Sequence, residues 1–112
     1  MTFSKIDKFD DESQEIARIC KALSHPARVA ILKFLAKSKT CISGDITNEI
    51  PLSRTTVSQH LQELKKSGLI HGEIEGTKVN YCLCKPCIGK YRKLFDSFLK
   101  EIDIEIDCKT NC

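Results

Sequence analysis

The feature that most constrains the fold is a helical pattern that passes directly into a hairpin pattern in the second half of the chain. Val57, Leu61 and Leu64 recur at the spacing of one helix face. Ser53 is a favourable N-cap for this helix, and Gly68 suits the left-handed backbone position after its last turn. This segment is therefore predicted to be a short helix with one buried face.

A hairpin is predicted immediately after this helix. Apolar residues at Leu69, Ile70 and Ile74 lead to a turn at 75–77, and residues 79–83 then alternate apolar and polar side chains. Alternation with a period of two is typical of a half-buried strand, and a short polar segment with glycine is typical of a hairpin turn.

Four further helices are predicted around this unit. They cover about residues 11–23, 26–36, 43–49 (capped by Ser43 and stopped by Pro51), and a last helix that begins after Pro86. The resulting order is that of a winged helix-turn-helix, which is mainly α with a β-hairpin wing.

Length and composition restrict the class further. The chain has 112 residues, of which 41% are hydrophobic and 29% charged, and this fits one domain over 1–112 rather than a collagen-like or disordered chain. We expect 1–10 to be a loosely ordered N-terminus and 103–112 a cysteine-containing tail. No apolar run approaches the ~18–20 residues that span a bilayer. We therefore expect a soluble cytoplasmic protein, with no membrane partner.

The charge distribution favours a polyanion as partner. The net charge is only +3, but residues 16–40 hold six basic residues and no acid, whereas residues 101–107 hold four acids and no base. A domain of this size has little room for a deep enclosed active site. We expect no enzyme and no small organic substrate.

The predicted helix after Ser53 presents hydrogen-bonding side chains opposite its apolar stripe, which suits base edges and phosphates in a major groove. Such a face is also compatible with an ordinary solvated surface. The order of the elements and the basic first half favour DNA. The predicted DNA-binding residues, with Lys78 just past the hairpin turn, are Ser53, Arg54, Thr55, Thr56, Ser58, Gln59, His60, Gln62 and Lys78.

Three segments together resemble one known family. Residues 23–32 resemble the second-helix signature of the ArsR/SmtB family of winged-helix metal sensors, residues 52–70 look like its recognition helix, and residues 72–81 are similar to its wing. The resemblance implies a repressor that binds an inverted repeat in double-stranded operator DNA and leaves when an inducer binds. It also implies a homodimer formed through the first and last helices. The residues that suit this interface are Ile88, Tyr91, Phe95, Phe98 and Leu99.

The chain has seven cysteines, and in a reducing compartment they favour metal binding or redox chemistry over a disulfide framework. Cys82, Cys84 and Cys87 lie at the predicted junction of the last strand and last helix. Three thiolates at this spacing could form a three-sulfur pyramid, which suits trivalent arsenic, whereas zinc would need a fourth ligand. Cys20 is expected to be a small core residue, and none of the three histidines is expected to be a ligand.

Cys41 is the other candidate. Arsenic-sensing members of the family have a Cys-x-Cys pair at the start of the first helix of the DNA-binding motif, and here the second position is Ser43. Either Cys41 recruits other thiols, such as Cys108 or Cys112, or the site has moved to the cluster at 82–87. The predicted metal ligands are Cys41, Cys82, Cys84 and Cys87; trivalent arsenic or antimony is the favoured inducer, and zinc or cadmium is possible.

Two alternatives remain open from the sequence. A disulfide or persulfide, for example between Cys41 and Cys108, could replace the metal as the switch. The segment Cys84-Lys-Pro-Cys87 also has the form of a thioredoxin-like redox motif, although such a motif should lie early in a βαβ pattern, and here four predicted helices precede it.

Overall fold

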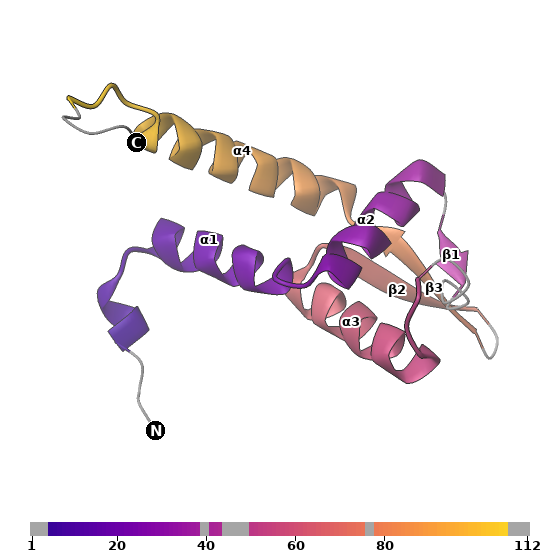
Figure 1. Cartoon of the computed structure of the whole chain (residues 1–112). Helices are drawn as coiled ribbons and strands as arrows, with labels where there is room; N and C mark the ends of the chain where they lie inside the picture. Colours follow the sequence, from indigo (N-terminus) through magenta and orange to yellow (C-terminus); the bar gives the residue numbers. More distant parts are fainter. Residues whose placement is uncertain (1–4, 39–40, 44–49, 76–77, 108–112) are drawn as a thin grey trace.

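The computed structural model describes residues 5–38, 41–43, 50–75 and 78–107 (Figure 1). None of the helices in these ranges is long and apolar enough to cross a membrane. The elements are, in order, a 3-10 turn η1 (Lys5–Lys8), α1 (Asp11–Ala22), α2 (Pro26–Ser38), β1 (Ile42–Ser43), α3 (Arg54–Ser67), β2 (Ile70–Glu75), β3 (Lys78–Leu83) and α4 (Lys85–Ile102).

The predicted hairpin is confirmed, and a third strand joins it. The antiparallel sheet has the order β1-β3-β2, with Ile42 opposite Tyr81 and His71 opposite Cys82. Ser43 lies in β1, so the helix predicted over 43–49 does not begin as expected, and its remaining residues lie outside the described part of the chain. The short strand was not predicted because two residues carry no periodicity.

The helix ends follow the predicted capping chemistry. The Ser53 hydroxyl accepts a hydrogen bond from the backbone N–H of Thr56 at 3.2 Å, and Gly68 ends α3 with a φ of 86°. At the start of α2, the Nδ1 atom of His25 accepts a hydrogen bond from the backbone N–H of Ala27 at 3.0 Å. The two capping hydrogen bonds, to Ser53 and to His25, satisfy backbone N–H groups that the first turn of a helix leaves unpaired.

One hydrophobic core joins the four α-helices to the sheet. Ile19 of α1, Ile31 of α2, Leu64 of α3 and Ile70 of β2 are almost completely buried in it. The C-terminal part of α4 runs away from this core beside α1 and ends with exposed apolar side chains, among them Leu99 (Figure 1).

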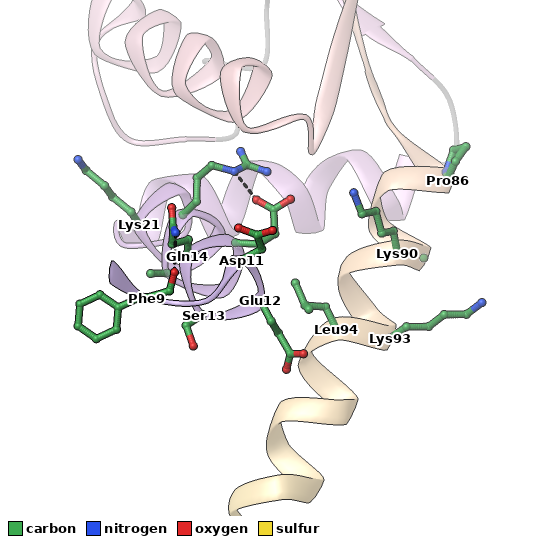
Figure 2. Close-up of a pocket in the computed structure, with 14 residues that line it drawn as sticks. Phe9, Asp11, Glu12, Ser13, Gln14, Lys21, Pro86, Lys90, Lys93 and Leu94 are labelled. Atoms are coloured by element: carbon green, nitrogen blue, oxygen red, sulfur yellow. Dashed lines mark hydrogen bonds and ion pairs between the residues drawn. The ribbon is translucent and has the colours of Figure 1, made fainter. Parts of the chain in front are cut away.

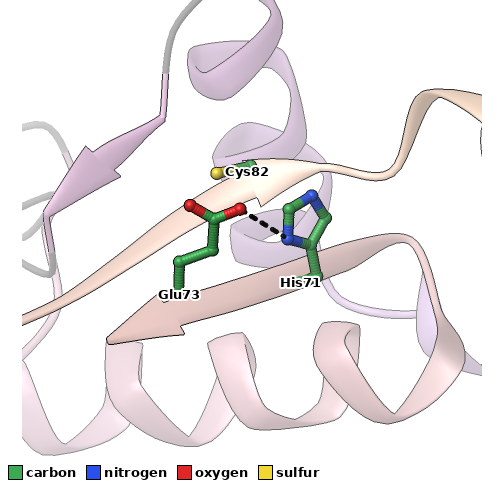
Figure 3. Close-up of side chains that lie close together, drawn as sticks. All are labelled: His71, Glu73 and Cys82. Carbon is green, nitrogen blue, oxygen red and sulfur yellow. Dashed lines mark ion pairs between the residues drawn. The ribbon is translucent and has the colours of Figure 1, made fainter. Parts of the chain in front are cut away.

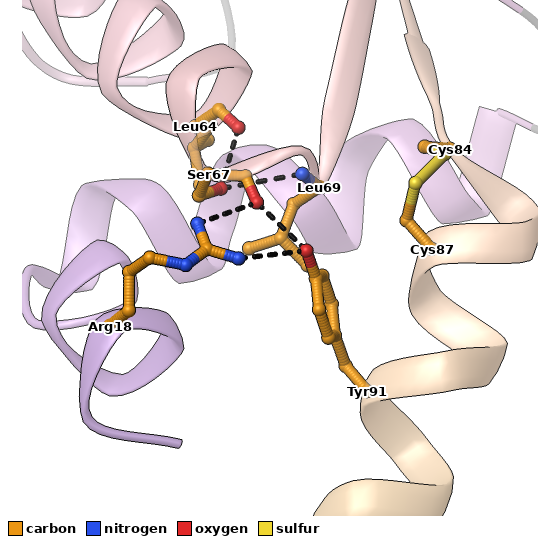
Figure 4. The surroundings of a disulfide bond; sticks show 7 residues. All are labelled: Arg18, Leu64, Ser67, Leu69, Cys84, Cys87 and Tyr91. Atoms are coloured by element: carbon orange, nitrogen blue, oxygen red, sulfur yellow. Dashed lines mark hydrogen bonds between the residues drawn. A yellow bond between two sulfur atoms is a disulfide. The ribbon is translucent and has the colours of Figure 1, made fainter. Parts of the chain in front are cut away.

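A hydrogen-bonded cluster connects α1, α3 and α4 at the end of α3 (Figure 4). Arg18 donates to the Ser67 carbonyl at 3.1 Å and to the Tyr91 hydroxyl at 3.0 Å, and the Tyr91 hydroxyl donates to the same carbonyl at 3.0 Å. The buried Ser67 hydroxyl donates to the Leu64 carbonyl at 2.6 Å. Tyr91, predicted to face a second subunit, is thus buried within its own chain because its hydroxyl finds partners there.

Gly68 provides a test of this cluster. We expect Gly68→Ala to lower the free energy of unfolding by about 1–2 kcal/mol, since its backbone is left-handed. A Cβ would also lie 3.2 Å from the Tyr91 hydroxyl. Gly89→Ala is the matched control: a Cβ there meets nothing within 4 Å, so helix propensity should leave stability unchanged or raised by up to ~1 kcal/mol. Urea unfolding measures the free energy of unfolding of both variants. Equal changes in the two variants would contradict a special backbone requirement at Gly68.

Candidate DNA-binding face and thiol site

The N-terminal half of α3 presents an exposed polar face. Thr55, Ser58, Gln59 and Gln62 are exposed together with Arg54, as predicted for a helix that contacts base edges. Ser53 and Thr56 serve the helix itself, because their hydroxyl oxygens lie 2.9 Å apart and Ser53 caps the first turn. Lys78 is the first residue of β3, next to the predicted turn of the wing.

His60 is a correction to the predicted DNA-binding set. Its side chain is turned inward and only 8% exposed, and its Nδ1 atom accepts a hydrogen bond from the Arg28 guanidinium at 3.1 Å. The His25 ring lies 4.4 Å away, centroid to centroid. Burial is the main cause that lowers the pKa of His60, and the charges of His25 and Arg28 add to it. His60 therefore joins α3 to α2 as a neutral imidazole.

This arrangement predicts a pH dependence of stability. Because the pKa of His60 is depressed in the folded state, the unfolded chain takes up the proton first. The stabilising contribution is present above about pH 6.5, the ordinary imidazole value, and is lost as the pH falls through the lower folded value. We expect acidification from pH 7 to pH 5 to lower the free energy of unfolding, and His60→Gln to reduce that slope. A slope unchanged in His60→Gln but reduced in His71→Gln, the exposed control, would contradict this assignment.

The thiol site lies across the sheet. Cys41 directly precedes β1, and continuation of the β1–β3 register places it opposite Cys82. The two residues are joined by a disulfide although 41 positions separate them, with their Cα atoms 4.4 Å apart. That distance matches a non-hydrogen-bonded antiparallel pair, for which about 4.5 Å is usual. The sheet register therefore brings these two predicted ligands together.

His71, which the sequence analysis did not expect to be a ligand, and Glu73, which it did not select, lie beside Cys82 (Figure 3). His71 is the β2 partner of Cys82, and Glu73 follows on the same face of β2. The ligand atoms of His71, Glu73 and Cys82 all lie within 4.8 Å of one another. Cys82 is buried, whereas His71 and Glu73 are exposed. Counting back from the observed Glu75–Lys78 pair places His71 opposite Cys82, whereas a turn at 75–77, as predicted, would have placed it opposite Tyr81.

Cys84 and Cys87 form a second, separate pair (Figure 4). Their disulfide closes the first turn of α4, and their Cα atoms are 5.3 Å apart. The backbone N–H of Cys84 donates to the Leu69 carbonyl at 2.9 Å, so this turn is held next to the end of α3. The structure thus divides the four predicted metal ligands into two pairs rather than gathering Cys82, Cys84 and Cys87 into one set.

Cys20 is a free thiol exposed on α1, so the prediction that it belongs to the core is wrong. Its neighbour Ile19 takes the inward position, and adjacent residues on a helix point in directions about 100° apart.

A hollow lies between α1 and α4 (Figure 2). Phe9 and Leu94 contribute apolar surface, and Lys90 and Lys93 line its α4 side. Of the residues predicted for a dimer interface, Ile88 and Phe95 pack partly against the core, Phe98 is half-buried, and Leu99 is 52% exposed.

A capped helix with an exposed polar face, followed by a two-stranded wing, defines the class as a winged helix-turn-helix DNA-binding protein. Known proteins agree with this class. The family model described as "Bacterial regulatory protein, arsR family" matches residues 25–71. The uncharacterized HTH-type transcriptional regulator MJ1325 of Methanocaldococcus jannaschii is 33% identical over 77% of this chain and 97% of its own length. The chain belongs to the ArsR/SmtB family of transcriptional regulators.

Two further relatives support the same assignment. The HTH-type transcriptional regulator CmtR of Mycobacterium tuberculosis is 37% identical over 61% of this chain and 57% of its own length. The solved structure of an ArsR-like transcriptional regulator from Rhodococcus sp. RHA1 superposes with a TM-score of 0.67 at 26% identity, covering 80% of this chain and 83% of the other.

Proposed function

We propose that this protein is a cytoplasmic, homodimeric repressor that binds operator DNA through α3 and the wing and releases it when Cys41 and Cys82 become bonded. The observation that carries the proposal is the pairing of these two cysteines across β1 and β3. The reaction removes two protons and two electrons from the thiols, and peroxide accepts them and becomes water; polysulfide is a second suitable oxidant class.

The position of the pair supports a route by which its state would affect DNA binding. β3 is both the strand that carries Cys82 and one arm of the wing. Cys41 precedes the segment that leads to α3, so the bond ties the entry of the DNA-binding motif to the wing. Strand β2 of the wing also packs on α3. The amino group of Lys65 lies next to Gly72, 3.5 Å from the position that a Cβ would take there. A coupling of ~1–3 kcal/mol would change operator affinity about 5–150-fold.

Dimerisation would give the protein two recognition helices for an inverted repeat. The exposed apolar side chains of Leu99 and Ile102 on α4, and the hollow between α1 and α4, support the predicted pairing of first and last helices. Tyr91 is not part of this surface, because it is buried inside its own subunit. A two-fold axis through these helices would present both copies of α3 to one DNA duplex.

A thiophilic inducer is the second candidate, and one observation favours it. Each cysteine pair, when reduced, offers two thiolates close enough to chelate one soft ion such as trivalent arsenic or antimony. The described residues do not preassemble a third sulfur at either pair, so a pyramidal arsenic site would need another thiol. Titration of the reduced repressor–operator complex with arsenite under anaerobic conditions tests this version.

Catalysis by Cys84 and Cys87 has little support. They follow a strand and open a helix, but the described sheet is antiparallel, whereas thioredoxin-like motifs belong to a βαβ unit with a parallel strand pair. The relatives are transcriptional regulators.

Specific DNA contact predicts that Gln59→Ala costs about 1–3 kcal/mol in operator affinity and leaves non-specific binding almost unchanged, because Gln59 is exposed at the predicted groove-facing position. Fluorescence anisotropy with operator and scrambled duplexes measures both. Lys78→Gln should instead reduce by about one the slope of log affinity against log salt concentration. Lys100→Gln, at the far end of α4, is the matched control. Equal losses on operator and scrambled DNA in Gln59→Ala would contradict base recognition.

The thiol switch predicts that Cys41→Ser keeps operator affinity but loses its sensitivity to peroxide, because the bond to Cys82 can no longer form. Cys20→Ser, which removes the free exposed thiol, is the matched control and should respond like the unaltered chain. Mass spectrometry should show a loss of two hydrogens per bond formed in the responsive proteins. A full response in Cys41→Ser that disappears in Cys84→Ser would assign the switch to the other pair and overturn this proposal.

A further inference from the structure

Three metal-binding side chains, His71, Glu73 and Cys82, lie together on one face of the sheet, and Cys41 is bonded to Cys82 there. Cys41, Cys82 and His71 occupy one row across β1, β3 and β2, because the β1–β3 register continues to Cys41 and His71 is the β2 partner of Cys82. Glu73 lies two residues further along β2 and therefore on the same face. The sheet thus brings one sulfur, one nitrogen and one oxygen donor together, and the Cys41 sulfur, which is bonded to that of Cys82, is the second sulfur donor.

We propose that, when Cys41 and Cys82 are reduced, these four side chains bind one divalent cation of borderline softness, such as Zn(II). Two thiolates, an imidazole and a carboxylate are all ligands that zinc takes in four-coordinate sites. The set does not suit trivalent arsenic, which prefers three sulfurs, or magnesium, which prefers oxygen ligands only. Binding displaces the two thiol protons, and no electrons are transferred.

Three of the four side chains need only small adjustments to reach one ion, and Cys41 turns towards them when its bond to Cys82 opens. The ligand atoms of His71, Glu73 and Cys82 already lie within 4.8 Å of one another. With zinc–ligand bonds of about 2.0–2.3 Å, the atoms must approach to within about 3.3–3.8 Å. Cys82 is held in place by burial, whereas His71 and Glu73 are exposed and can rotate towards it. The His71 Nδ1 atom is 3.9 Å from a Glu73 oxygen, so both side chains already point into the same space.

The metal and the disulfide exclude each other, because both use the sulfur atoms of Cys41 and Cys82. A dithiol reductant opens the disulfide: the reductant becomes a cyclic disulfide, and its two electrons and two protons pass to the cysteines. The cation then takes the place of those protons. Occupation should therefore slow oxidation of Cys41 and Cys82. The site shares its thiols with the proposed switch, but its occupation does not depend on DNA binding.

The test uses the full chain, reduced with a phosphine and titrated anaerobically with Co(II), then with competing Zn(II). We expect one cobalt per chain, with the visible bands of tetrahedral cobalt and an ultraviolet thiolate-to-cobalt band. His71→Ala and Glu73→Gln should each weaken cobalt affinity at least about tenfold. Cys41→Ser should halve the ultraviolet band, and it keeps Cys82, whose loss from a buried position could impair folding. Glu105→Gln and Cys20→Ser are the matched controls.

Two results would overturn the site: no tetrahedral cobalt spectrum in the reduced protein, or binding that survives in His71→Ala and Cys41→Ser but is lost in Cys84→Ser. A second readout is the rate of disulfide formation under peroxide, which zinc should slow at Cys41–Cys82 and leave unchanged at Cys84–Cys87. Neither of these two readouts, cobalt binding and the rate of disulfide formation, involves operator DNA. A protein that responds to peroxide on DNA but binds no cobalt would refute this site and leave the proposed function standing.

Discussion

The pairing of β3 with both of its neighbours is the constraint on which the thiol chemistry depends. Because β3 is the central strand, Cys82 meets Cys41 on one side and His71 on the other. A shift of either partner by one residue would turn its side chain to the opposite face and separate the pair. The sheet face opposite the cysteines is packed in the core through Ile70 and Tyr81, so such a shift would expose apolar surface. Core packing therefore maintains the geometry of the thiol site.

The proposed recognition helix, α3, is held from several directions. At its C-terminal end, the Ser67 carbonyl accepts hydrogen bonds from Arg18 of α1 and Tyr91 of α4. In its middle, His60 accepts a hydrogen bond from Arg28 of α2. The contacts of Ser67 join α3 to α1 and α4, the helices of the hollow that we assign to the dimer interface, and the contact of His60 joins it to α2. A change in the wing, transmitted to α3, would therefore alter the relation between the two DNA-binding faces of a dimer.

Much of the fold follows from local sequence patterns, and the site follows only in part. Ser53, Gly68 and the stripe of Val57, Leu61 and Leu64 fix α3 because capping and periodicity are local. The pairing of Cys41 with Cys82 could not be predicted in the same way, since β1 has only two residues and no periodic signal.

Two of the errors in the sequence analysis, at His60 and Tyr91, have a common physical origin. His60 and Tyr91 have polar groups that can satisfy themselves within the chain, and hydropathy alone does not indicate that. His60 was assigned to DNA and Tyr91 to a second subunit, yet Arg28, Arg18 and Ser67 give them internal partners. Sequence periodicity identifies a face but not the long-range partner that covers it.

The most direct measurement is the thiol–disulfide equilibrium of Cys41–Cys82 with and without operator DNA, using a variant whose other cysteines are serine. If bonding weakens DNA binding, reciprocity requires operator DNA to favour the dithiol by the same factor. The account predicts that saturating operator raises the midpoint potential, by about 30 mV for each tenfold difference in affinity. Scrambled DNA should raise it less. An identical potential in the presence and absence of operator would show that the pair and the DNA-binding face are independent, and would contradict the account.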